Sequence, residues 1–136
     1  MHYLNSLEAI NTSNKRFVDF VQGKSKDQLP PSGTFLYVDV RDVALAHVKA
    51  IEVPEAGNQR FFITNGYFTN KDIVDSIRES HPQLDSKLPP KDSARDLPSG
   101  IYGFDNQKSI NVLGLQYQPF KKTVGDTVES LLAAGA

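Results

Sequence analysis

Residues 35–51 read FLYVDVRDVALAHVKAI, and this stretch predicts a strand that runs directly into a helix. Phe35 to Val40 consists mainly of aromatic and β-branched residues, which suit a pleated, half-buried strand. Four of the apolar residues that follow recur at helical spacing, namely Val43, Ala46, Ala50 and Ile51. Asp39 and Asp42 stand at the junction, where a carboxylate can accept hydrogen bonds from the first free N–H groups of a helix. The stretch therefore indicates an α/β fold with a capped helix start.

The same stretch carries a family resemblance. Residues 37–47, YVDVRDVALAH, resemble a signature of the extended short-chain dehydrogenase/reductases (the NAD-dependent epimerase/dehydratase superfamily), in the branch of dihydroflavonol, cinnamoyl-CoA and fungal methylglyoxal and ketone reductases. Residues 57–63, GNQRFFI, look like that family's next strand. DNQKS at 105–109, followed by Leu113-Gly114, looks like its late helix. The resemblance covers roughly residues 3–133 and corresponds to the carboxyl-terminal half of such an enzyme.

That resemblance implies an α/β fold, namely the carboxyl-terminal substrate subdomain of an extended Rossmann-type reductase with an incomplete parallel sheet. Residues 1–136 would be one substrate-binding portion, and the nucleotide-binding portion would be absent from the chain. The family implies NADP as cofactor, which this chain alone is not expected to bind. A dinucleotide site needs a glycine-rich turn between a strand and a helix. Gly100 and Gly103 have a suggestive spacing, but Asp96-Leu97-Pro98-Ser99 cannot be a buried strand, so a loop turn is favoured.

The family's catalytic pair is Tyr-x-x-x-Lys, in which the ammonium lowers the pKa of the phenol. This spacing occurs at Tyr67 and Lys71, but Thr69 followed by Asp72 resembles a capping box, so Tyr67 would precede the helix that contains Lys71. It occurs again in Tyr117-Gln118-Pro119-Phe120-Lys121, where the proline would disrupt a helix that carried both residues. We therefore expect no catalytic residue in this chain, and by the family's order the true pair would lie upstream.

Composition excludes several classes of protein. The chain has 136 residues and a net charge of −1 without a strong run of either sign, so we expect no binding to nucleic acid or to an anionic membrane. It has no cysteine, which excludes disulfides, thiolate metal sites and a cysteine nucleophile. No apolar stretch reaches the length of a membrane-spanning helix and no signal-peptide pattern is visible, so a cytosolic location is expected.

Metal and hydrolase chemistry have no support in the sequence. His2, His47 and His81 are not at ligand spacing for one another, so no metal site is expected. There is no Gly-x-Ser-x-Gly motif, so a serine hydrolase would lack its nucleophile.

Periodicity predicts helices alternating with two strands. The expected helices are at about 3–21, 43–51, 70–80, 106–113 and 121–134, and the expected strands at 35–40 and 59–64. The order strand, helix, strand fits one right-handed parallel unit. Prolines disfavour a helix or strand in residues 83–104, which are expected to form a long loop.

The substrate pocket is placed by the resemblance near the start of the chain and the entry to the first strand. The expected wall residues are Tyr3, Leu4, Leu7, Phe35 and Tyr37. Simple core packing is the alternative role for the same five side chains.

The resemblance implies one function and leaves an alternative open. The first is the substrate-domain portion of an NADP-dependent carbonyl reductase, acting on an aldehyde or ketone and inactive alone. The second is a non-catalytic α/β module, derived from such a reductase, that binds a small ligand or a protein. Phe61-Phe62-Ile63 is apolar on both faces, so the chain is also expected to expose apolar surface and to self-associate.

Overall fold

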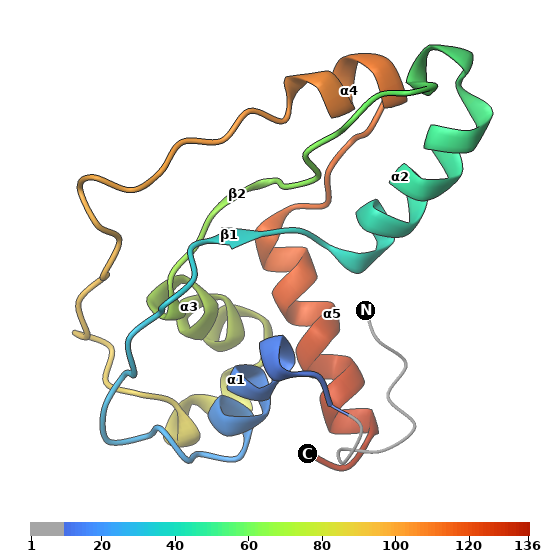
Figure 1. The fold of residues 1–136 in the computed structure, drawn as a ribbon. Helices are drawn as coiled ribbons and strands as arrows, with labels where there is room; N and C mark the ends of the chain where they lie inside the picture. Colours follow the sequence, from blue (N-terminus) through green and yellow to red (C-terminus); the bar gives the residue numbers. More distant parts are fainter. Residues whose placement is uncertain (1–9) are drawn as a thin grey trace.

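The computed structural model describes residues 10–136 of the chain. Helices α1, α3 and α5 gather at one end of the molecule, α2 and α4 lie at the other, and extended segments connect the two ends (Figure 1). The elements, with η for 3-10 helices, are α1 Thr12–Val21, β1 Leu36–Tyr37, α2 Val40–Glu52, η2 Pro54–Ala56, β2 Gly66–Tyr67, α3 Asn70–Ser80, η3 Pro82–Lys87, α4 Gln107–Leu113 and α5 Phe120–Ala133.

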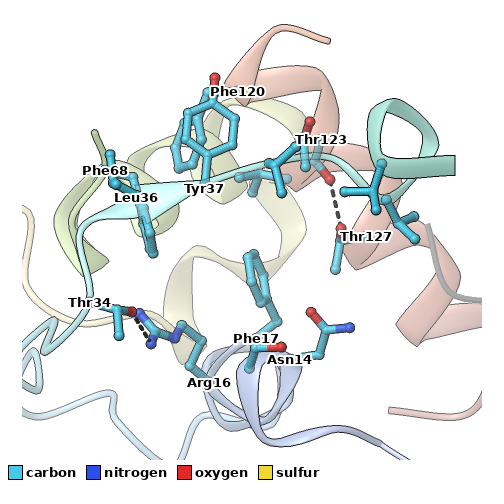
Figure 2. Close-up of a pocket in the computed structure, with 15 residues that line it drawn as sticks. Asn14, Arg16, Phe17, Thr34, Leu36, Tyr37, Phe68, Phe120, Thr123 and Thr127 are labelled. Atoms are coloured by element: carbon cyan, nitrogen blue, oxygen red, sulfur yellow. Dashed lines mark hydrogen bonds between the residues drawn. The ribbon is translucent and has the colours of Figure 1, made fainter. Parts of the chain in front are cut away.

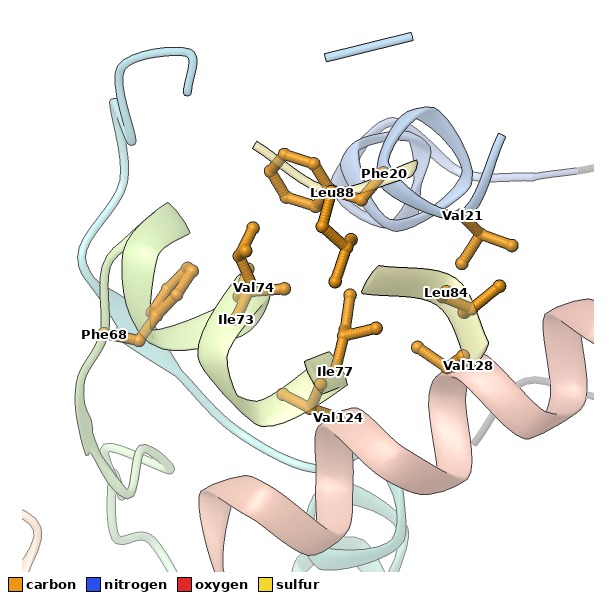
Figure 3. Packing of buried hydrophobic residues seen from close by; sticks show 10 residues of the cluster. All are labelled: Phe20, Val21, Phe68, Ile73, Val74, Ile77, Leu84, Leu88, Val124 and Val128. Carbon is orange, nitrogen blue, oxygen red and sulfur yellow. The ribbon is translucent and has the colours of Figure 1, made fainter. Parts of the chain in front are cut away.

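The main hydrophobic core lies between α1, α3, η3 and α5 (Figure 3). Helix α3 is central to it, because Ile73, Val74 and Ile77 are completely buried. The other buried members are Phe20, Val21, Phe68, Leu84, Leu88, Val124 and Val128. Each fully buried aliphatic side chain contributes about 1.5–3 kcal/mol to folding. This core fixes α1 against α3 and α5, and α1 and α5 border the cavity described below.

The helix starts and ends follow the sequence signals. Asp39 caps α2 by accepting a hydrogen bond from the backbone N–H of Arg41 at 2.9 Å, as predicted. The predicted capping box of Thr69 and Asp72 is confirmed at the start of α3. Gly114, with φ +67°, ends α4 in the left-handed conformation that glycine adopts without strain. The helices expected at 70–80, 106–113 and 121–134 agree with α3, α4 and α5 to within one residue.

The sheet differs from the sequence prediction. The expected parallel pairing is wrong for the strands seen here, because β1 and β2 pair antiparallel, with Leu36 opposite Tyr67 and Tyr37 opposite Gly66. The expected strand at 59–64 precedes β2, and within residues 10–136 the backbone of residues 60–63 makes no hydrogen bond. Aromatic and β-branched residues favour extended backbone, but a strand also needs a neighbouring strand to pair with.

Helix α2 has one buried face and one exposed face. Ala46 is buried in a small second cluster with Ala56, Leu113 and Leu115, which joins α2 to α4. On the other face Leu45, Val48 and Ile51 are 42%, 50% and 87% exposed. The expectation that Ile51 shares the face of Ala46 is therefore wrong, since the core at this end is small and covers only one side of α2.

The predicted loop at 83–104 begins with η3 and is then irregular up to α4. Its backbone crosses the outside of the molecule from the α3 end toward α4 (Figure 1). Two side chains fasten it. The carboxylate of Asp96 accepts hydrogen bonds from the N–H and hydroxyl of Ser32 at 2.7 and 2.6 Å, and Arg95 pairs with Asp72 at 3.0 Å.

Candidate functional site

A cavity of about 390 Å³ lies between α1, β1, α2 and α5 (Figure 2). Its wall is mainly apolar, and this part consists of Phe17, Leu36, Tyr37, Val38, Val40, Val43, Phe68, Phe120 and Val124. The polar side chains in the wall are Ser13, Asn14, Arg16, Thr34, Thr123 and Thr127. A concave, mostly apolar space with a few polar groups is typical of a small-molecule site.

Three aromatic rings form one side of the cavity. Tyr37 meets Phe120 edge to face at a centroid distance of 4.8 Å, and Phe68 lies 5.9 Å from Phe120. The hydroxyl of Tyr37 accepts a hydrogen bond from the side-chain amide of Asn65 at 2.8 Å, and the same amide donates to the carbonyl of Gln118. Burial raises the pKa of Tyr37, so its phenol keeps its proton. These contacts give Tyr37 a fixed position in the wall.

Arg16 contributes a cation to the wall, next to Phe68. Its Nη1 donates to the carbonyl of Ser32 at 3.3 Å and to Oδ1 of Asn70 at 3.2 Å, and its Nη2 donates to Oγ1 of Thr34 at 3.0 Å. The guanidinium carbon lies 5.5 Å from the ring centroid of Phe68. Burial lowers the pKa of Arg16. Sequence reasoning missed Arg16, because an arginine in an amphipathic helix gives no signal of its own.

The structure places the predicted wall residues unequally. Tyr37 lines the cavity, whereas Phe35 is not among its lining residues and instead accepts a backbone hydrogen bond from Phe68 at 2.8 Å. Tyr3, Leu4 and Leu7 lie outside the described residues. Substrate binding by these five residues stays a prediction.

Tyr67 and Lys71 do not form a catalytic pair in this structure. Tyr67 is in β2, and its hydroxyl donates to the carbonyl of Tyr102 at 2.6 Å. Lys71 is in α3 and pairs with Asp75, with Nζ 2.7 Å from Oδ1. The prediction that Tyr67 precedes the helix is confirmed, and both polar groups are engaged elsewhere.

The second Tyr-x-x-x-Lys spacing is separated in the same way. Pro119 stands at the start of α5, so Tyr117 lies before the helix and Lys121 within it. The hydroxyl of Tyr117 lies 2.7 Å from the hydroxyl of Ser109, and Lys121 pairs with Glu79 at 2.6 Å.

The two aspartates of the opening stretch connect the start of α2 to α5 and to the residue just before Pro119. The carboxylate of Asp39, which is inaccessible to solvent, accepts hydrogen bonds from Arg41 and from the hydroxyl of Thr123 on α5. Burial acts to raise the pKa of Asp39, but the hydrogen bonds from Arg41 and Thr123 outweigh it and hold the pKa well below its usual range. Asp42 accepts a hydrogen bond from the N–H of Gln118 at 3.0 Å, and burial raises its pKa.

Within residues 10–136 no group of three or more histidine, aspartate or glutamate side chains is placed to hold a metal ion. No helix in the same part of the chain is long and apolar enough to cross a bilayer.

Comparison with known proteins relates the chain to reductases. It is 50% identical over 131 residues to ketoreductase azaE of Aspergillus niger, covering 96% of this chain and 39% of that protein. It is 32% identical over 125 residues to a putative NADPH-dependent methylglyoxal reductase, GRP2, of Candida albicans, covering 90% of this chain and 36% of that protein. No protein-family model matches.

Solved structures agree with the sequence relatives. The crystal structure of Gre2 from Candida albicans in complex with NADPH superposes with a TM-score of 0.81 at 30% identity, covering 99% of this chain and 40% of that one. The chain thus spans about two fifths of the length of the proteins that it matches, a share that fits the carboxyl-terminal portion indicated by its motifs. The chain belongs to the extended short-chain dehydrogenase/reductase family, in the branch of the fungal ketone and methylglyoxal reductases.

Proposed function

We propose that this chain is the substrate-side portion of an NADP-dependent reductase of small aldehydes and ketones. The observation that carries the proposal is the cavity between α1, β1, α2 and α5, which offers an apolar wall with Tyr37 held in it. The relatives named above are a ketoreductase and a putative methylglyoxal reductase, which supports a carbonyl substrate. In this proposal the side chains of Leu36, Tyr37 and Phe17 contact the hydrocarbon part of the substrate. The proposed location of the enzyme is the cytosol.

The described residues do not fit a dinucleotide. Gly100 and Gly103 lie in the irregular segment before α4, not between a strand and a helix, and α4 has only seven residues. Pyrophosphate binding uses a glycine-rich turn at a helix N-terminus close to a strand. We therefore assign NADP, the hydride and the proton-donating tyrosine to a nucleotide-binding portion outside this chain.

A surface for such a portion is available. The exposed side of α2 presents Leu45, Val48 and Ile51, and Phe62 in the neighbouring extended segment is 52% exposed. The backbone of residues 60–63, unpaired within residues 10–136, could add to the edge of a sheet. We propose that the nucleotide-binding portion covers this surface, and that without it the chain is inactive and self-associates.

The test is reconstitution. The chain is coexpressed with the part of ketoreductase azaE that does not align with it. NADPH oxidation is then measured with a panel of ketones, simple aldehydes and methylglyoxal. The pair should turn over a carbonyl substrate, whereas each part alone should not. In the active pair, Leu36→Ala should raise KM for bulky ketones more than it changes kcat, because Leu36 lines the cavity.

A matched control is Leu29→Ala, which truncates a half-buried leucine that packs against the main core and does not line this cavity. Stable pairing without turnover of any carbonyl compound would contradict the reductase proposal. The non-catalytic module would then be the better interpretation.

A further inference from the structure

Among the described residues, the groups that hold the cation in the cavity wall, Arg16, are all neutral. Within residues 10–136 Arg16 forms no salt bridge, whereas Arg41, Arg78 and Arg95 each pair with an aspartate. The acceptors of Arg16 are a carbonyl, an amide and a hydroxyl, all of them neutral. A partly buried charge is costly unless an opposite charge balances it. The site therefore favours a ligand that brings a negative charge.

The guanidinium also keeps donors available. A guanidinium has five N–H donors in a planar fork, and the bonds to Ser32, Asn70 and Thr34 use three of them. The ring of Phe68 lies beside the cation and shields one side of it from water. The remaining donors suit a planar, singly charged carboxylate, which arginine binds through paired hydrogen bonds.

The position of Arg16 is fixed before any ligand binds. Its acceptor Asn70 is itself held in place: the backbone N–H of Asn70 donates to the hydroxyl of Ser32 at 2.8 Å, and its side-chain amide donates to the carbonyls of Pro30 and Pro31. Ser32 in turn donates twice to Asp96, so both oxygens of that carboxylate are engaged. A side chain held in this way loses little freedom on binding a ligand.

The rest of the cavity suits an apolar group. Figure 2 shows Arg16 directed to Thr34 on one side, and Phe17 projecting toward the side that carries Leu36 and Tyr37. A ligand with its anionic end at Arg16 would place its body along these apolar side chains.

We propose that this cavity binds small carboxylic acids with an apolar body, the carboxylate on Arg16 and the body against Phe17, Leu36 and Tyr37. If the proposed function holds, the substrates of the complete reductase include oxo acids of this shape. The binding step is a property of the described residues and needs neither cofactor nor catalytic residue.

The experiment measures binding to this chain directly. The probe is β-benzoylpropionate, an aromatic oxo acid, compared with its uncharged methyl ester by isothermal titration calorimetry. The acid should bind at least about tenfold more tightly than the ester, as expected of a charge-assisted pair in a partly desolvated site. Arg16→Gln should remove this preference, and Arg16→Lys should keep part of it.

The control is Lys15→Gln, which removes the same charge from the neighbouring position of α1, where the lysine side chain is 62% exposed and absent from the cavity lining. It should leave the affinity for the acid unchanged. Equal binding of acid and ester to the unmodified chain, or equal loss in Arg16→Gln and Lys15→Gln, would overturn the proposal. If Arg16→Gln does not fold, the comparison of acid with ester decides.

This result is independent of the reductase assay. If the chain binds the acid but the reconstituted pair shows no turnover, the carboxylate site is supported and the proposed reductase function is refuted. If the pair reduces neutral ketones but the chain does not prefer the acid to the ester, the reductase function is supported and the carboxylate site is refuted.

Discussion

The guanidinium of Arg41 lies 2.6 Å from the inaccessible carboxylate of Asp39 and 2.6 Å from the carboxylate of Asp126. The first contact is local to the start of α2, and the second spans 85 residues to α5. Thr123 adds a hydrogen bond to Asp39 from the wall of the cavity. A helix cap that the sequence suggested is thus also the link that holds α2 against α5.

Asp39→Asn should destabilise the chain by about 2–3 kcal/mol, because it leaves the hydrogen-bonded guanidinium without its buried anion. Asp126→Asn should cost less, since that side chain is 22% exposed and also pairs with Lys122. Urea denaturation of the two variants measures the difference. Equal decreases in the free energy of unfolding would show that the burial of Asp39 does not increase its contribution to stability.

The stability of the chain should fall in acid. A carboxylate whose pKa is lowered by folding stabilises the folded state above its ordinary pKa, and this contribution is lost as the pH falls through the lowered value. Asp39 is such a group. The free energy of unfolding should therefore decrease below about pH 4, less steeply in Asp39→Asn than in the unmodified chain. Some slope should remain in the variant, because the pKa of Asp96 and of Asp126 is also lowered.

Thr69→Ala should cost about 1 kcal/mol, and Thr69→Ser much less, because serine keeps the hydroxyl that caps α3. Thermal unfolding compares the two variants. The side chain is completely buried and bonded to Asp72, so its role is structural. Unchanged melting temperatures in both variants, together with a loss of ligand binding, would refute the capping role.

Local signals explain how far the sequence predicted the fold. Helices α3, α4 and α5 were predicted because their signals lie within the helix itself or next to it: the apolar spacing of α3 and α5, the capping box of α3 and Gly114 at the end of α4. The antiparallel pairing of β1 with β2 was not predicted, because it joins residues about thirty positions apart and depends on tertiary contacts. Residues 60–63 have strand composition without a partner in the described chain, so their composition predicted a strand that the structure does not form.

The site was predicted less well for the same reason. Tyr37 was found through its place in the family motif, and it lines the cavity. Arg16 is held in the cavity wall by Ser32, Thr34 and Asn70, which the fold brings to it from other parts of the chain. No spacing within α1 distinguishes such a residue from an arginine on a solvated helix face.

Tyr67→Phe should leave turnover of the reconstituted reductase unchanged. The hydroxyl of Tyr67 donates to the carbonyl of Tyr102, and Lys71 pairs with Asp75, so neither group is arranged for proton transfer. NADPH oxidation by the paired proteins measures this. The unpaired chain should give only background turnover, and turnover that disappears in Tyr67→Phe would make Tyr67 a catalytic residue.

The exposed apolar face of α2 gives the last prediction. Leu45, Val48 and Ile51 follow one another at intervals of three on a single side of the helix, and Ile51 is almost fully exposed. Contiguous apolar surface of this kind promotes association. The chain alone should bind a hydrophobic dye and scatter light as an oligomer, and Ile51→Glu should reduce both signals.

Gln83→Glu is the matched control, because it makes the same change in net charge at an exposed position of η3. It should leave dye binding and scattering unchanged. Coexpression with the uncovered part of ketoreductase azaE should suppress association of the unmodified chain, since that part is proposed to cover α2. If the chain is a monodisperse monomer that binds no dye and is indifferent to the added part, α2 is not an interface. The interpretation as a non-catalytic module would then be the better one, because the described residues would need no partner to cover them.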